Sequence, residues 1–304
     1  MKREIKNITA SIRAKLANIS KAQGIDFDAL LLRYFQERFL YRIAISEYSE
    51  NFVLKGGLLL VYFQMPGTRP TKDIDFLAED LSNDQTELEN IFKEIAQLQF
   101  DDGVKFDPSS VSSERIKEDA DYEGIRMKIE ASLGQARKRM QMDIAFGDII
   151  IPKAKKIEFP TLLEQLPPKI KVYSPESIIS EKFEAMVKLA MANSRMKDFY
   201  DVYTFSINYN YQGSRIKKAI ESTFIRRKTP LTENPLIFQR EFHDDSGRQR
   251  QWTAFLRKSR IAIDANFSQI MERITDFLKP VVTSVINKTE LKETWNPSLG
   301  QWKK

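Results

Sequence analysis

The chain has 304 residues, 42% of them hydrophobic, and can therefore bury one large core or two moderate ones. It contains no cysteine and one histidine, which excludes disulfides, zinc–thiolate and iron–sulfur sites, cysteine nucleophiles and multi-histidine metal centres. A net charge of +6, from 48 lysines and arginines against 42 acidic residues, favours polyanionic partners.

Helices are predicted to open the chain. Apolar residues recur at helical spacing from residue 5 to about residue 47, and Gly24 interrupts them as a turn would. A short apolar segment, residues 52–54, then leads into a glycine turn, and residues 58–64 are predicted to form a helix.

A mixed α/β core is predicted for residues 51–151. Residues 73–78 alternate acidic and apolar side chains, the period of a strand with one polar face, and residues 88–99 have helical spacing. Two more alternating segments, residues 125–133 and 140–146, flank a polar turn at residues 134–139. We therefore expect them to be antiparallel neighbours in one sheet.

A domain boundary is predicted in the stretch of residues 152–173, whose four prolines resist regular structure. Ser174 before Pro175 then has the pattern of a helix start. Helical spacing follows in residues 198–206, 215–226 and 263–279, whereas residues 229–251 are polar and loop-like and include His243. The predicted divisions are residues 1–151 for N-terminal helices plus core, 152–173 for a linker and 174–304 for a mainly helical domain.

The first group of candidate functional residues lies around the glycine turn. Asp73 and Asp75 stand two apart on a predicted strand, so both carboxylates point to one face and can bind the same hard cations, with Mg²⁺ the natural choice. Gly56 and Gly57, after Lys55, would expose backbone amides to a triphosphate. Taken singly, each piece also fits a plain turn or two solvent-facing acids, whereas the combination favours function.

Asp143 is the second candidate, because it is an acid within an otherwise apolar strand, where an unpaired charge is costly. A shared metal would offset that cost, although a strand-end aspartate in water is equally compatible with the sequence. Three carboxylates from neighbouring strands around two cations are the usual arrangement for nucleotidyl transfer.

A third group lies in the helical part of the chain. Lys182 is predicted to lie on one helix, where it could face a phosphate, and Asp198 and Asp201 stand three apart on the next helix, after Arg195. Solvated charges on amphipathic helices explain such runs equally well.

Four motifs in this order resemble the AbiEii/AbiGii family of nucleotidyltransferase-like toxins, and the likeness spans residues 37–203. They are Phe52-Val53-Leu54-Lys55-Gly56-Gly57; Arg69-x-Thr71-x-Asp73-Ile74-Asp75-Phe76; Asp143-Ile144-x-Phe146-Gly147; and Glu181-Lys182 with Arg195-x-Lys197-Asp198-x-x-Asp201. Gly57 stands where many nucleotidyltransferases have serine, so no hydroxyl is available there for phosphate contact.

This resemblance implies an α+β fold with a polymerase-β-like nucleotidyltransferase core, N-terminal helices before it and a helical C-terminal domain. It implies a two-ion Mg²⁺ site at Asp73, Asp75 and Asp143, with Lys182, Asp198 and Asp201 as further catalytic residues. The residues assigned to the nucleoside triphosphate are Lys55, Gly56, Gly57, Arg69, Thr71 and Arg195, with Lys182 also facing the triphosphate.

The family further implies a toxin of a bacterial toxin–antitoxin or phage-defence system. The expected acceptor is RNA, with the tRNA acceptor end as the target whose modification blocks translation, and the expected protein partner is a cognate antitoxin. Two alternatives stay open: transfer to a protein side chain, and a nucleotide- or RNA-binding regulator that has lost turnover. All three expected carboxylates are present, which argues against the regulator.

No segment is suited to a membrane. The N-terminal residues lack the apolar core of a signal peptide, and the longest apolar run, residues 57–63, is too short to span a bilayer. We therefore expect a cytoplasmic protein.

Overall fold

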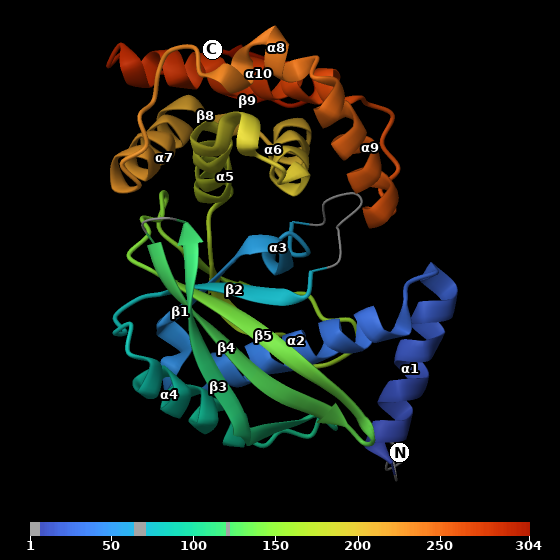
Figure 1. Cartoon of the computed structure of the whole chain (residues 1–304). Helices are drawn as coiled ribbons and strands as arrows, with labels where there is room; N and C mark the ends of the chain where they lie inside the picture. The colour runs from blue at the N-terminus through green and yellow to red at the C-terminus, as the bar shows by residue number, and fades with distance from the viewer. Residues whose placement is uncertain (1–6, 64–70, 120–121) are drawn as a thin grey trace. The chain divides into compact units, whose positions relative to one another are not determined.

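The structure is a computed structural model that describes residues 7–63, 71–119 and 122–304. The chain divides into two compact units. Of the described residues, the sheet unit comprises 7–63, 71–119, 122–147 and 155–172, and the helical unit comprises 148–154 and 173–304. Each unit is shown in Figure 1 with the labels used below.

The sheet unit contains a seven-stranded mixed sheet in the order β3-β4-β5-β2-β1-β7-β6. Strand β2 pairs in parallel with β5, and β1 pairs in parallel with β7, while the other neighbours are antiparallel. The strands are β1 (Phe52–Lys55), β2 (Asp73–Ala78), β3 (Lys105–Asp119), β4 (Tyr122–Leu133), β5 (Ala136–Phe146), β6 (Lys155–Glu158) and β7 (Lys169–Val172).

Helices α2 (Phe27–Ile45) and α4 (Gln85–Gln97) lie along one face of this sheet, and α1 (Ile8–Gln23) precedes them (Figure 1). Helix α4 packs on the sheet because its buried side chains recur at helical spacing and form one apolar stripe. Asp26 and Asp84 cap α2 and α4 by accepting hydrogen bonds from backbone amides in the first turn.

The strands alternate as their sequences predict. Ile125, Met127 and Ile129 of β4 are buried, whereas Arg126 and Lys128 between them are partly exposed. The sheet therefore has one apolar face toward the helices and one polar face, and the candidate aspartates lie on the polar one. The predicted antiparallel hairpin of residues 125–133 and 140–146 is confirmed.

Two local predictions were wrong in the sheet unit, and one strand was missed. The turn between β4 and β5 is only two residues long, since Leu133 pairs with Ala136. The helix expected at residues 58–64 is the short α3 (Gly56–Leu59). Strand β3, with Pro108 and a register shift between Asp107 and Ser112, was not predicted, because the shift breaks its alternation.

The stretch of residues 152–173, predicted to lack regular structure, contributes β6 and β7 to the sheet. Its prolines fall outside these strands, so each four-residue strand keeps its amide donors. The loop between the strands is held by α2, where Glu37 accepts the amide of Leu162 at 2.9 Å and Arg38 donates to the carbonyl of Leu166 at 3.2 Å.

The helical unit begins as predicted, because the side chain of Ser174 caps α5 (Pro175–Leu189) by accepting a hydrogen bond from the backbone amide of Ser177. A small sheet of β8 (Tyr211–Gln212), β9 (Thr294–Asn296) and β10 (Gln301–Lys303) lies among its helices. The helices are α5 (Pro175–Leu189), α6 (Met196–Asn208), α7 (Gly213–Arg226), α8 (Arg240–His243), α9 (Ser246–Ser259) and α10 (Phe267–Ile286).

The prediction of a polar loop at residues 229–251 was wrong. This stretch contains a 3₁₀ turn at Leu236–Phe238, helix α8 and the start of α9. His243 is buried, and its Nε2 lies 2.9 Å from the carbonyl oxygen of Ile237. Its apolar neighbours Ile237 and Phe242 are also buried, so sparse hydrophobic residues are enough to fix the segment. Among the described residues, no helix is long and apolar enough to cross a membrane.

A buried ion pair ties α2 to the loop before β3. Arg42 donates to both carboxylate oxygens of Asp102, at 2.5 and 3.0 Å, and both side chains are nearly inaccessible to solvent. Arg42→Met would leave the Asp102 carboxylate buried without its partner, and we expect a loss of about 3–5 kcal/mol in the free energy of unfolding.

Urea unfolding checks this expectation, with Lys138→Met as the control. Lys138 pairs with Asp28, which lies on α2 as Arg42 does, but both of these side chains are partly exposed. This change is therefore expected to cost less than about 1 kcal/mol. Equal losses in the two variants would contradict the assigned importance of the buried pair.

Candidate functional site

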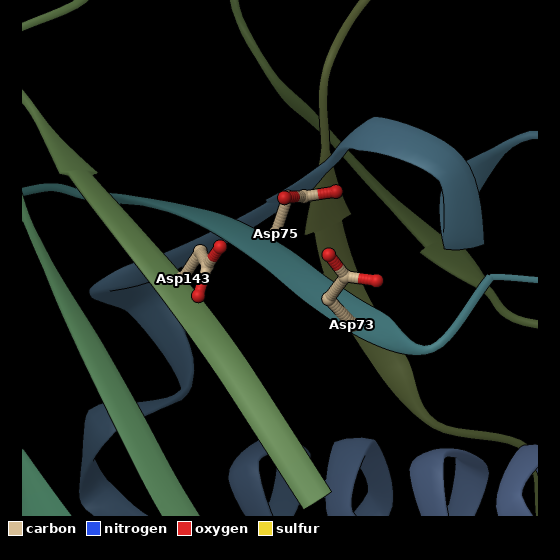
Figure 2. Close-up of side chains that lie close together, drawn as sticks. All are labelled: Asp73, Asp75 and Asp143. Atoms are coloured by element: carbon tan, nitrogen blue, oxygen red, sulfur yellow. The ribbon is translucent and has the colours of Figure 1, made fainter. Parts of the chain in front are cut away.

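Strand register brings the three predicted metal ligands together. In the parallel pair of β2 and β5, Asp75 lies directly opposite Asp143, and Asp73 lies two residues before Asp75 on the same face. One carboxylate oxygen from each residue lies within 4.8 Å of the others. Figure 2 shows the three side chains clustered on one side of the two strands. No second group of potential metal ligands occurs in the part of the chain that the structure describes.

Asp143 has a partner that the sequence did not reveal. Arg126 of β4 donates to both of its carboxylate oxygens, each at 2.9 Å, and Gln141 donates to one of them at 3.3 Å. The hydrogen bond to Asp143 raises the pKa of Arg126, so this guanidinium carries its charge at every physiological pH. This pair of parallel hydrogen bonds, here called the Arg126–Asp143 fork, fixes the orientation of the carboxylate, and the guanidinium offsets its charge.

The same register forms a row of charges across five strands. Lys55 lies opposite Asp75, Asp75 opposite Asp143, Asp143 opposite Arg126, and Arg126 opposite Glu114. Cross-strand neighbours share a face of a sheet, so the two inner carboxylates are flanked by a cation on each side. This arrangement reduces the repulsion between Asp75 and Asp143.

Gly56 gives Asp75 its space. Its φ is +68°, a conformation that side chains disfavour, and a Cβ atom at this position would lie 1.8 Å from Oδ2 of Asp75. The amide of Gly57 donates to the same oxygen at 3.4 Å. The glycine pair predicted to bind a triphosphate therefore has a structural task, which is to seat a carboxylate of the cluster.

The cluster suits a divalent cation. Its potential donors are hard, anionic oxygens, the ligands that Mg²⁺ prefers. Arg126 occupies one lone pair on each oxygen of Asp143, and Gln141 takes the second one on Oδ1, so Oδ2 keeps a lone pair for a metal. Thr71, also predicted at this site, lies beside Asp73, with its hydroxyl 3.5 Å from the carboxylate.

The predicted residues of the helical unit form their own cluster. The ammonium of Lys182 lies 2.7 Å from Asp198 and 2.8 Å from Asp201, whose side chains are almost completely buried. Burial alone would raise the pKa of Asp198, but the charge of Lys182 and its hydrogen bond hold this pKa below the ordinary value. The positive charge of Lys182 thus compensates the negative charges of two buried carboxylates, and this role does not depend on contact with a phosphate.

Arg195, which precedes α6, has an exposed side chain, and its amide donates to Asn193 at 2.8 Å. Arg69 lies outside the described residues. The structure therefore groups Asp73, Asp75 and Asp143 in the sheet unit and Lys182, Asp198 and Asp201 in the helical unit, and the roles of all these residues stay predictions.

Arg126 is the main residue of the site that sequence reasoning missed. The predicted six-residue turn shifted the hairpin register, because pairing residue 133 with 140 places residue 126 opposite Gly147. The observed two-residue turn places it opposite Asp143. The signal was the alternation that continues through Arg137 and Arg139, which extends β5 back to the turn.

A family model described as the nucleotidyl transferase AbiEii toxin of a type IV toxin–antitoxin system matches residues 38–273. The crystal structure of JHP933 from Helicobacter pylori is similar over 86% of this chain and 95% of its own, with 12% identity and a TM-score of 0.49. A presumed nucleotidyltransferase from H. pylori is similar over 87% and 99%, with 14% identity and a TM-score of 0.49. No curated protein matches the sequence.

The role of Gly56 can be tested with one added methyl group. Gly56→Ala places a Cβ where the Asp75 carboxylate lies, so we expect binding of Mn²⁺, a spectroscopic substitute for Mg²⁺, to weaken at least tenfold. Gly24→Ala is the matched control, since Gly24 has a φ of +64° but nothing within 4 Å of its Cβ position.

Both changes carry a cost of about 1–2 kcal/mol for a left-handed residue with a side chain. Gly56→Ala must also displace the Asp75 side chain, so its thermal melt should fall at least as far as that of Gly24→Ala. Cation binding, measured by electron paramagnetic resonance, should separate them. Unchanged Mn²⁺ affinity in Gly56→Ala would show that Asp75 does not need the space that Gly56 provides.

The Arg126–Asp143 fork can be tested without any metal. In EDTA, a double-mutant cycle of Arg126→Gln and Asp143→Asn should give a coupling of about 1–3 kcal/mol in the free energy of unfolding, because each single change leaves a partly buried polar partner. A coupling near zero would mean that the two side chains do not hold each other.

Proposed function

Because the chain belongs to the AbiEii family of nucleotidyltransferase toxins of type IV toxin–antitoxin systems, we propose that it uses Mg²⁺ to transfer a nucleotide from a nucleoside triphosphate to RNA. The observation that supports this most directly is the convergence of Asp73, Asp75 and Asp143 on one face of β2 and β5. Three carboxylates from adjacent strands suit a two-cation site for in-line displacement at a phosphorus atom.

In this proposal, Asp73 and Asp75 are the principal metal ligands and Asp143 is the third. Magnesium bound there would act as a Lewis acid on the α-phosphate and orient the triphosphate. The acceptor oxygen forms a bond to the α-phosphorus as the bond to pyrophosphate breaks, and the hydroxyl proton leaves the acceptor. Asp143 is the candidate acceptor for that proton, and Arg126 and Gln141 fix its direction.

We further propose that the sheet unit is a polymerase-β-like core. A glycine turn after β1, an Asp-x-Asp pair on the neighbouring β2 and a third aspartate on β5 support this assignment. Lys55 and Thr71, with Gly56, Gly57 and Arg69, remain the predicted triphosphate contacts of this core.

In the helical unit, Lys182 and Arg195 remain predicted phosphate contacts. Asp198 and Asp201 are proposed to orient Lys182, since both pair with its ammonium. The wider proposal is that of a cytoplasmic toxin that modifies the tRNA acceptor end, blocks translation, serves in phage defence and is paired with an antitoxin.

The metal assignment predicts a sharp separation of activity from stability. Asp73→Asn and Asp75→Asn remove a charge with little change of shape, so nucleotide transfer should fall by roughly two orders of magnitude or more, and growth arrest should disappear. Relief of carboxylate repulsion should leave the thermal melts unchanged or higher.

Glu130→Gln is the control. Glu130 is an exposed acid of β4 that lies on the same face of the sheet as the three aspartates but outside their cluster. Its transfer rate should match the parent. Parental rates in a folded Asp75→Asn variant would refute the metal assignment, and label transferred to protein instead of RNA would favour a protein acceptor.

A further inference from the structure

The positive charge of this protein is concentrated in one part of the chain. Residues 173–304 hold 22 lysines and arginines against 15 acidic residues, whereas residues 1–172 hold 26 against 27. Residues 173–304, which form most of the helical unit, therefore carry a net charge of +7, whereas residues 1–172, which contain the carboxylate cluster, carry −1.

Helix α9 is the most one-sided segment. Residues 246–260 contain five lysines and arginines and no acidic residue. Arg248 is buried, and the other four side chains are exposed; they are Arg250, Arg257, Lys258 and Arg260, here called the α9 basic surface.

Helix geometry gives this surface a regular spacing. Trp252 is buried on the inner side of α9, while Arg250 and Arg257 lie on the opposite side. These two arginines are seven residues apart, which is two turns or about 10 Å along the axis. Lys258 lies beside Arg257, and Arg260 follows at the left-handed C-terminal cap.

The helix is packed firmly into its unit. Arg248 donates to the carbonyls of Asn193 at 2.9 Å, Ala190 at 3.1 Å and Met191 at 2.9 Å, and Trp252 donates to Ala265 at 2.9 Å. The basic surface is thus presented by an anchored helix and not by a loose charged tail.

Within the described part of the chain, the exposed cations of α9 have no acidic partners. None of the four forms an ion pair with a residue that the structure describes, and Arg250 only donates to Ser246 at 3.3 Å. Some lysines of the sheet unit do pair with an acidic residue, as Lys138 does with Asp28 and Lys156 with Glu50. Like charges that repel one another without compensation are suited to an external polyanion.

We propose that the α9 basic surface binds the phosphate backbone of the RNA acceptor. That the partner is RNA rests on the proposed function, whereas the position of the binding surface rests on the structure of α9. Arginine supplies a planar fork that matches a phosphate, and the two-turn spacing lets Arg250 and Arg257 reach separate phosphates along a strand.

The test compares two triple variants of the full chain. In one, Arg250, Arg257 and Lys258 become Gln; in the control, the exposed Arg215, Lys218 and Lys279 of α7 and α10 become Gln. Both lose three positive charges from the same unit, so nonspecific attraction falls equally. Thermal melts should match the parent in both, because all six side chains are exposed.

Binding is measured with fluorescently labelled total tRNA, in EDTA and without nucleotide, over a series of salt concentrations. For the α9 variant we expect affinity to fall on the order of tenfold or more, and the slope of log K against log salt to shrink by about 2–3, since each lost contact removes about 0.7–0.9. The control should stay within about twofold of the parent.

Equal loss of affinity in both triple variants would overturn the proposal, because net charge alone would then explain binding. It would also fail if the α9 variant kept its RNA affinity but lost binding to phosphatidylglycerol vesicles. The proposed function is judged separately: a parent that binds RNA through α9 but transfers no nucleotide would refute the function and leave the surface standing.

Discussion

The geometry of the site depends on the parallel register of β2 and β5, which forces carboxylates into a space where they repel one another. Asp75 and Asp143 are directly opposed, and Asp73 lies one step along the same face. At such separations like charges oppose folding unless something compensates them. Arg126 does so for Asp143 from the next strand, and a divalent cation would do so for the cluster as a whole.

The remaining features of the sheet unit maintain this arrangement. The absence of a side chain at Gly56 allows Asp75 its position, and the helices beneath the sheet bury the apolar residues that alternate with the aspartates. Because a one-residue slip would turn every side chain to the other face, burial of Ile74 and Met142 fixes the outward direction of their acidic neighbours. The hydrophobic core thus determines where the polar chemistry lies.

The sequence was sufficient where local periodicity and a motif agree. Alternation predicted β2 and most of β4 and β5, and the Ser174–Pro175 pattern predicted the start of α5. It was insufficient where long-range contacts decide: β6 and β7 are stabilised by a sheet edge and by α2, and residues 229–251 by burial of a few scattered side chains. Arg126 was missed because a pairing partner depends on the exact turn length, which composition does not determine.

The most direct test of the account uses the unmodified chain, each α-labelled nucleoside triphosphate in turn, Mg²⁺ and a mixture of total cellular RNA and protein. We predict that label from at least one triphosphate enters RNA, that EDTA abolishes the transfer, and that pyrophosphate is released in equal amount. Absence of labelled RNA with every triphosphate, under conditions where Mn²⁺ binds to the chain, would contradict the claim that the carboxylate cluster supports nucleotide transfer to RNA.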